Sequence, residues 1–196
     1  MKKLSLILCL LFICIMPAMI VADSMEDEED YDERWFIAPS VKMTQFNEEL
    51  GTVLGLRIGW IAASSFTIEG SFYGLINDID SPRAGSDIGA GYSGLSLEYS
   101  IPIGQKVHIL INTMLGIGRV SYKRDYSEPK NPDKDNLSSI IAIVEPGLGL
   151  EIGVTDYLRI VLGASYRSVD RVELSNLSND DISGITGNIA LKFGAF

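Results

Sequence analysis

Apolar and polar residues alternate with a period of two through most of this chain, and this pattern restricts the fold more than any other feature. In the clearest case, segment 158–167, every second position is apolar or aromatic: Leu158, Ile160, Leu162, Ala164 and Tyr166. Such alternation is typical of strands with one apolar and one polar face. No helical repeat is sustained after residue 34, so the chain is predicted to be all-β.

Eight segments show this alternation and are predicted to be strands: 34–43, 51–61, 65–75, 88–101, 107–120, 139–152, 158–168 and 184–195. A strand of about 11 residues, rising ~3.3 Å per residue and tilted by ~40°, covers roughly 28 Å along a barrel axis. This length matches the apolar band of about 25 Å around an outer-membrane barrel. We therefore expect an eight-stranded antiparallel up-and-down transmembrane β-barrel over residues 34–196.

The connections between these strands alternate in length. Tight turns are predicted at 62–64, 102–106 and 153–157. The other connections are longer and more polar: 44–50, 76–87, 121–138 and 169–183. Short turns on the periplasmic side and long loops outside are typical of transmembrane barrels. An even strand number then places both termini in the periplasm, and it makes 76–87, 121–138 and 169–183 the candidate segments for an extracellular ligand.

The N-terminal segment is predicted to direct export. Residues 1–22 combine a positive start (Lys2, Lys3) with an apolar run and a small residue, Ala22, before the expected cleavage site, as in a secretory signal peptide. Both cysteines of the chain lie within this segment. Residues 23–33 follow as an acidic periplasmic segment, best interpreted as a solvated tail. Weak binding of divalent cations, recognition of a periplasmic partner and protection against aggregation stay open for it.

The polar face of the predicted strands is rich in glycine and serine and carries a few long charged residues. Glycine weakens a solvent-facing strand without packing anything, so small residues between long charged ones favour a narrow, filled interior. Charges in such an interior must be paired to offset desolvation. The predicted interior charge network consists of Lys42, Arg57, Glu69, Glu98, Glu145, Glu151, Arg159, Arg167 and Lys192. It is nearly neutral, although the chain has a formal net charge of -10.

Aromatic residues gather near the predicted strand ends, as expected for side chains at the two headgroup levels of a bilayer. One predicted girdle, at the periplasmic ends, comprises Trp35, Trp60, Phe66, Tyr99, Tyr157 and Phe193. The other, at the outer ends, comprises Phe72, Tyr92, Tyr122 and Tyr166. The lipid of the outer membrane is the partner that these girdles imply.

Taken together, residues 34–196 resemble the small eight-stranded outer-membrane barrels of the OmpA/OmpX type. The resemblance implies that the terminal aromatic, Phe196, serves as the signal read by the barrel-assembly machinery. Phe196 is one residue out of step with the apolar parity of the last predicted strand. Pro39 and Pro146 interrupt strands, and they require bulges or lost ladder bonds.

The sequence offers little for catalysis, metal binding or nucleic-acid binding. The only histidine, His108, has Leu110 rather than a serine two residues later, unlike the barrels that deacylate lipid A. No His or Cys ligand spacing predicts a metal site, no cofactor is expected, and an excess of 26 acids over 16 bases excludes nucleic-acid binding.

We therefore expect a non-enzymatic envelope scaffold that displays surface loops. Passive passage of small hydrophobic molecules through a wall weakened near Gly91, Gly94, Pro39 and Pro146 is an alternative, and a lipid A-modifying enzyme is another. A soluble barrel with its apolar face inside is the remaining possibility.

Overall fold

The computed structural model describes residues 34–47, 49–63, 65–82, 86–124, 138–194 and 196. The signal peptide predicted at 1–22 and the acidic segment 23–33 lie outside these ranges. Residues 125–137, which belong to the loop predicted at 121–138, also lie outside them. No helix within the described ranges is both long and apolar enough to cross a membrane.

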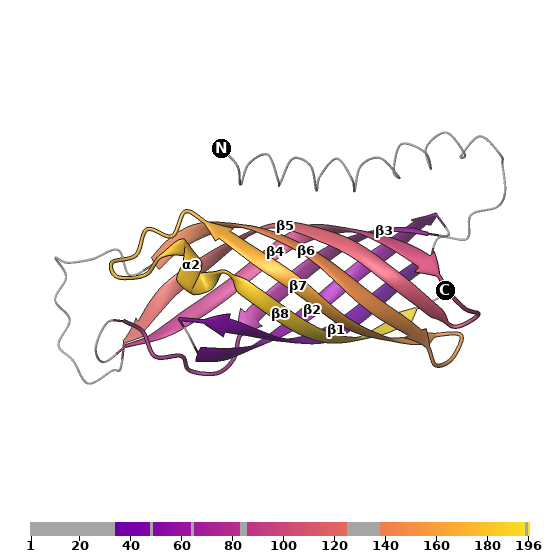
Figure 1. Ribbon diagram of the computed structural model, residues 1–196, viewed down its shortest axis with the longest axis horizontal. Coiled ribbons are helices and arrows are strands. Elements are labelled where there is room, and N and C mark those ends of the chain that lie inside the picture. The colour runs from indigo at the N-terminus through magenta and orange to yellow at the C-terminus, as the bar shows by residue number, and fades with distance from the viewer. Residues whose placement is uncertain (1–33, 48, 64, 83–85, 125–137, 195) are drawn as a thin grey trace.

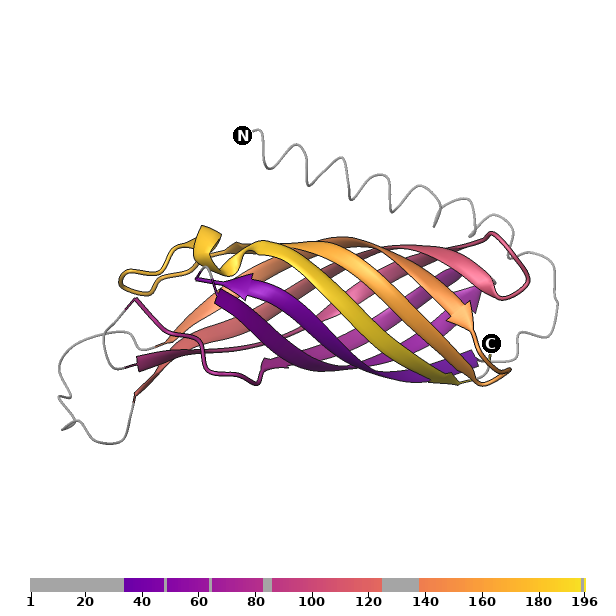
Figure 2. The same ribbon diagram turned by 60° about the horizontal axis from the view of Figure 1, so that its bottom comes forward.

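Eight antiparallel strands form a closed barrel in which every strand pairs with its sequence neighbours and β8 pairs with β1 (Figures 1 and 2). The predicted fold class is thus confirmed. The strands are β1 (Arg34–Phe46), β2 (Glu49–Ala63), β3 (Phe66–Leu75), β4 (Ser86–Pro102), β5 (Val107–Arg124), β6 (Ser138–Gly153), β7 (Leu158–Asp170) and β8 (Gly184–Gly194). One short helix, α2 (Asn179–Ile182), lies in the connection between β7 and β8.

The barrel has a short-turn end and a loop end, which lie at opposite ends of its long axis (Figure 1). The turns 103–106 and 154–157 lie at the short-turn end, together with Phe196 at the C-terminus. The first connection differs from its prediction, because the long loop expected at 44–50 is a tight turn. β1 and β2 continue their pairing as far as Phe46 and Glu49, and Asn47 makes the reversal with a φ of 45°.

Pro39 and Pro146 each leave a gap in the pairing with one neighbouring strand, and neither shifts the register. The β1–β8 pairing omits Ala38 and Pro39, and the β6–β7 pairing omits Glu145 and Pro146. On the other side of each proline strand the pairing is continuous. The predicted loss of ladder bonds is therefore confirmed, because proline has no N–H to donate.

The two faces of the barrel wall are opposite to those of a soluble barrel. Every strand presents large apolar side chains outward, among them Leu95, Ile117 and Ile185, which are 66 %, 67 % and 75 % exposed. The inward positions hold buried serines, threonines and charged residues. This arrangement matches a barrel in lipid rather than one in water.

The girdle prediction is wrong for two residues. Tyr92 and Tyr122 are buried inside the barrel, at 7 % and 6 % exposure, and do not reach the outward face. Their strand parity explains this, because Tyr92 shares the inward face of β4 with Glu98, and Tyr122 shares the inward face of β5 with Leu110. Of the remaining girdle residues, seven lie on the outward parity of their strands, and Tyr157 lies in the turn 154–157, where it is exposed.

Gly94 and Gly116 face each other across the β4–β5 ladder and allow a close approach of the two backbones. A Cβ atom added at Gly94 would lie 2.5 Å from the carbonyl oxygen of Leu115. Gly94→Ala is therefore expected to lower the free energy of unfolding by about 1–3 kcal/mol, since backbone atoms must move. The urea midpoint of the refolded barrel measures this effect.

Gly74→Ala is the matched control, because a Cβ atom added at Gly74 meets nothing within 4 Å. Its midpoint should stay the same or rise, since alanine is a better strand residue than glycine. An equal loss of stability in both variants would contradict the close-approach argument.

Candidate functional site

The barrel interior is the candidate site, because eight of the nine predicted network residues meet there in ion pairs. They form two groups. The larger group, here called the charge layer, consists of Arg57, Glu69, Glu98, Glu151, Arg159 and Lys192. The smaller group is the pair of Lys42 and Glu145.

Arg57 on β2 makes the most extensive contacts of the charge layer. Its Nε donates to Glu69 Oε2 at 2.8 Å and its Nη2 donates to Glu69 Oε1 at 2.6 Å, which is a bidentate pair between adjacent strands. Nη2 also donates to Glu98 Oε2 at 3.1 Å. Both carboxylates are almost completely buried, so this planar guanidinium compensates charge that water does not reach.

Lys192 on β8 extends the charge layer across the barrel. Its Nζ donates to Glu98 Oε1 at 2.5 Å and to Glu151 Oε2 at 2.8 Å. Arg159 Nη1 donates to Glu151 Oε1 at 2.6 Å. The six members come from β2, β3, β4, β6, β7 and β8, and they include three cations and three carboxylates. The charge layer is therefore neutral and joins strands from opposite walls.

The second group lies between β1 and β6. Lys42 Nζ donates to Glu145 Oε1 at 2.7 Å, and the hydroxyl of Ser165 donates to the same oxygen at 2.6 Å. The ammonium also lies 3.8 Å from the centre of the Tyr73 ring, a favourable cation–π contact. The pair is neutral, like the charge layer.

Arg167 is the surplus cation of the predicted network, and it has no carboxylate partner among the described residues. Its Nε and Nη2 donate to the carbonyl oxygen of Ile182 at 2.9 and 2.7 Å, and Nη2 also donates to that of Gln45 at 3.2 Å. The guanidinium lies 4.2 Å from the Phe46 ring. It thus joins β7 to the last residue of α2 and to the end of β1, near the loop end.

An apolar cluster, here called the apolar plug, fills the loop end of the interior. Inward residues of the strands form most of it, and residues from two connections, Ile79 and the segment 174–182, fold over them. Its buried members are Phe46, Val53, Tyr73, Leu75, Ile79, Ile88, Tyr92, Met114, Val120, Tyr122, Ile141, Ile143, Val169, Leu174, Leu177 and Ile182.

The apolar plug was not predicted from the sequence. Residues 140–144 form a continuous apolar run, IIAIV, which indicates a strand with apolar residues on its inward as well as its outward face. This run was the sequence feature from which part of the apolar plug could have been predicted. The folding of Leu174, Leu177 and Ile182 into the barrel leaves no comparable mark, because loop residues follow no fixed period.

The cavities that stay open among the described interior residues are small. One of about 30 Å³ lies beside Ser40, Lys42 and Glu145. Another, of about 70 Å³, lies at the short-turn end beside Arg34 and Phe196. Since one water molecule needs about 10–15 Å³ of such volume, these spaces suit a few waters rather than a solute.

His108 lies at the short-turn end, where its Nδ1 is 3.7 Å from Glu151 Oε1. Glu151 already accepts hydrogen bonds from Lys192 and Arg159. Among the described residues, Nδ1 is buried without a hydrogen-bond partner, and no group of three or more metal-binding side chains occurs.

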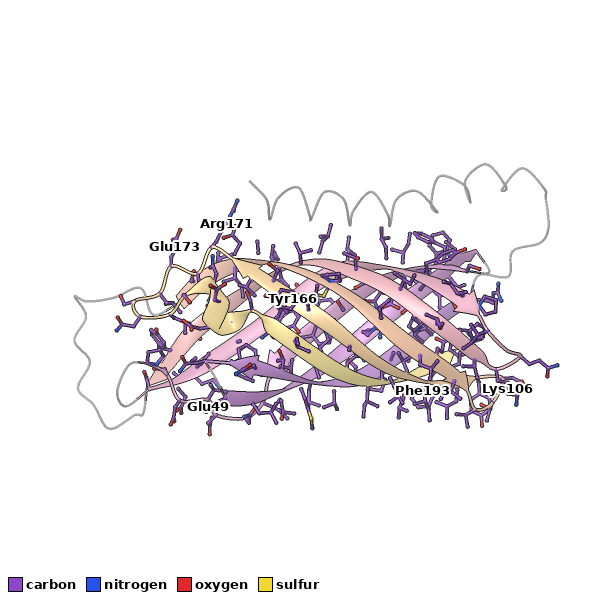
Figure 3. The ribbon with its side chains drawn as sticks, in the orientation of Figure 1. Glu49, Lys106, Tyr166, Arg171, Glu173 and Phe193 are labelled. Atoms are coloured by element: carbon purple, nitrogen blue, oxygen red, sulfur yellow. The ribbon has the colours of Figure 1, made fainter. Side chains whose placement is uncertain are left out.

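On the outward face, the aromatic residues lie toward both ends of the barrel. Trp35 and Trp60 stack with their ring centres 6.1 Å apart. Figure 3 shows Phe193 toward the short-turn end and Tyr166 nearer the loop end. Phe196 is different, since its ring lies 6.2 Å from the buried Phe36 ring and 4.1 Å from the Arg159 guanidinium.

No family model and no curated protein matches this chain. Solved structures of small outer-membrane barrels are similar to it. Neisserial surface protein A (NspA) has a TM-score of 0.60 at 12 % identity, covering 86 % of this chain and 99 % of that one. The N-terminal β-barrel domain of Pseudomonas aeruginosa OprF has a TM-score of 0.57 at 12 % identity, covering 82 % and 96 %.

Ail, the attachment invasion locus protein of Yersinia pestis, has a TM-score of 0.50 at 14 % identity, covering 83 % of this chain and 96 % of that one. These low identities establish a shared fold and nothing more specific. The chain has the fold of the small eight-stranded outer-membrane barrels, as the sequence resemblance implied.

Proposed function

We propose that this chain is an integral outer-membrane barrel of a Gram-negative bacterium, with its short-turn end in the periplasm. In this orientation both ends of the barrel segment are periplasmic. The outward apolar side chains on every strand support the location, because they are stable against lipid and costly in water.

The proposed role is that of a non-enzymatic scaffold that displays its loops. The observation that carries this proposal is the filled interior, which has a charge layer at one level and the apolar plug at another. A barrel of this size encloses little beyond its own side chains. The loops 76–87, 121–138 and 169–183 are then the surfaces that meet an extracellular ligand, and Phe196 is proposed as the signal for the barrel-assembly machinery.

The two alternative functions have weaker support. Lateral passage of a hydrophobic molecule requires an opening in the wall. Near Gly91 and Gly94, β4 and β5 pair without interruption from Ser86 to Pro102, and the gaps at Pro39 and Pro146 each affect one ladder without a shift of register. Lipid A chemistry requires an activated nucleophile. Among the described residues, the buried Nδ1 of His108 has no hydrogen-bond partner.

The test combines gel mobility with conductance. Outer-membrane extracts run unboiled should contain a compact, folded band that shifts on boiling, and the purified protein should give no steady unitary conductance in planar bilayers. A soluble periplasmic protein without a heat shift would contradict the membrane location. A reproducible channel would contradict the filled scaffold, and a change in lipid A mass on expression, abolished by His108→Ala, would instead establish an enzyme.

A further inference from the structure

An open groove with a volume of about 510 Å³ lies on the outward face of the barrel. It crosses β3, β4 and β5, and its lining includes Gly70, Phe72, Ser93, Leu95, Leu115 and Ile117. The apolar side chains that form its walls are prominent, since Phe72, Leu95 and Ile117 are 59 %, 66 % and 67 % exposed. The volume lies within the range of about 300–1,000 Å³ that is usual for small-molecule sites.

Gly94 and Gly116 in the groove floor serve the close approach of β4 and β5, but the outward Gly70 does not serve packing within the barrel. A Cβ atom added at Gly70 meets nothing within 4 Å. By contrast, the inward Gly55 makes room for the Tyr73 ring, which a Cβ atom there would approach to 2.2 Å. An outward glycine that makes room for nothing weakens its strand, so packing within the barrel leaves Gly70 unexplained.

Two cations continue the line of the groove toward the loop end. Along the outward face of β5, Ile117 is followed at every second position by Arg119, Ser121 and Lys123, about 7 Å per step. Across the ladder, Arg119 lies opposite Gly91. The Lys123 side chain crosses β4 at Gly89, where an added Cβ atom would lie 2.8 Å from Lys123 Cε.

Both cations are exposed side chains. Among the described residues, neither Arg119 nor Lys123 has a carboxylate oxygen within 4 Å, although Asp87 lies opposite Lys123 in the ladder. Their clustering at one end of an apolar groove stands out in a chain whose formal net charge is -10. The arrangement combines an apolar surface with a cationic end, which complements an acyl chain attached to an anionic headgroup.

We propose that the groove binds a phosphorylated acyl lipid of the outer leaflet. One acyl chain lies between Phe72, Leu95 and Ile117, and the phosphate lies against Arg119 and Lys123. Charge-assisted hydrogen bonds from a guanidinium to phosphate supply the selectivity. The inference rests on the proposed membrane location, because it requires the loop end to lie at the outer leaflet.

A second copy of this chain fits the groove less well. A two-fold interface brings the same residues of both copies together. A dimer centred on the groove would therefore place two sets of Arg119 and Lys123 in one contact, where like charges repel. The lipid brings the opposite charge instead.

The experiment is native mass spectrometry of the refolded barrel in detergent, with bisphosphorylated lipid A as the probe and phosphatidylcholine as the competitor. Gly70→Phe fills the groove, and the double variant Arg119→Gln/Lys123→Gln removes the charges. Gly187→Phe is the matched control for the first, because Gly187 is an equally open outward glycine on β8. Lys106→Gln is the control for the second, since Lys106 lies at the opposite end of the barrel (Figure 3).

We expect a one-to-one lipid A adduct that persists with excess phosphatidylcholine. Its abundance should fall at least tenfold in Gly70→Phe and in the double variant, and it should stay within twofold of the parent in both controls. An adduct unchanged in Gly70→Phe, or lost equally in Gly187→Phe, would overturn the site. Retention in the double variant would overturn recognition of the phosphate, and a dimer that Gly70→Phe dissociates would assign the groove to a second copy.

The heat shift of each sample separates this inference from the proposed function. A parent protein that shows no heat shift and does not enter membranes contradicts both proposals. A parent protein that is folded and inserted but binds no lipid A contradicts only the groove site. The charge variant retains the small groove residues, so it keeps the test decisive even if Gly70→Phe does not fold.

Discussion

Arg57→Met is expected to lower the free energy of unfolding by about 3–5 kcal/mol, because it leaves a buried carboxylate without its cation. Glu69 is 1 % exposed, and Arg57 supplies both of its hydrogen bonds in the charge layer. Equilibrium unfolding in urea measures the loss, with the fluorescence of Trp35 and Trp60 as the signal. A lower midpoint with an unchanged slope indicates a change in stability rather than in the unfolded state.

Arg159→Met is the matched variant and should cost less, about 1–2 kcal/mol. The Arg159 side chain is 22 % exposed, and its partner Glu151 keeps the hydrogen bond from Lys192. The double variant Arg57→Met/Glu69→Leu should recover most of the stability lost in Arg57→Met, since an apolar pair replaces the ion pair. Equal losses in the two single variants, or no recovery in the double variant, would contradict the role given to Arg57.

The fold was predictable because local patterns decide it. Alternation with a period of two identified all eight strands, and parity assigned Arg57, Glu98 and Lys192 to the same interior. The pairing of these charges was not predictable. Arg57 reaches Glu69 on the next strand, whereas Lys192 reaches Glu98 and Glu151 across the barrel. Such partners depend on strand tilt and stagger, which no single strand encodes.

The two wrongly predicted tyrosines show that residue type alone does not determine which face of a strand a side chain occupies. Tyr92 and Tyr122 have the residue type and the strand position of girdle residues, yet their parity directs them inward. Inside, Tyr92 packs against Tyr73 with ring centres 4.9 Å apart, and the Tyr122 hydroxyl donates to the Ser175 carbonyl oxygen at 2.6 Å. Parity was therefore a better guide than aromatic character.

The loop end was the least predictable part of the interior. The strands β5 and β6 extend beyond their predicted bounds, to Arg124 and back to Ser138, and the inward Tyr122 of this extension belongs to the apolar plug. A connection that supplies buried side chains to a barrel obeys no period, so its sequence resembles any polar loop. The segment 169–183 was accordingly assigned to display, although part of it closes the barrel.

Ile182→Ala is expected to open this closure. Ile182 is 1 % exposed in the apolar plug, and its carbonyl oxygen accepts two hydrogen bonds from Arg167. Truncation of a buried isoleucine costs about 2–5 kcal/mol. Because α2 belongs to a connection rather than to a strand, the loss should be local, and amide exchange across residues 172–183 should accelerate about 30-fold or more.

Ile185→Ala provides the control, because the same residue type three positions later is 75 % exposed on the outward face of β8. It should leave amide exchange across residues 172–183 unchanged. Similar exchange in both variants would mean that the apolar plug does not hold the connection in place. A loss of protection along β7 and β8 in Ile182→Ala would mean that the plug unfolds only together with the barrel.

The position of the apolar plug relative to the charge layer determines what its opening does. The ion pairs of Arg57, Glu98 and Lys192 join side chains of strands across the barrel interior, whereas Ile182 belongs to α2 in a connection. Opening the loop end in Ile182→Ala therefore leaves the charge layer intact. Planar-bilayer recordings of this variant should show no conductance, because a neutral layer of paired side chains still crosses the interior. Conductance in Ile182→Ala would instead make the apolar plug the only barrier to ions.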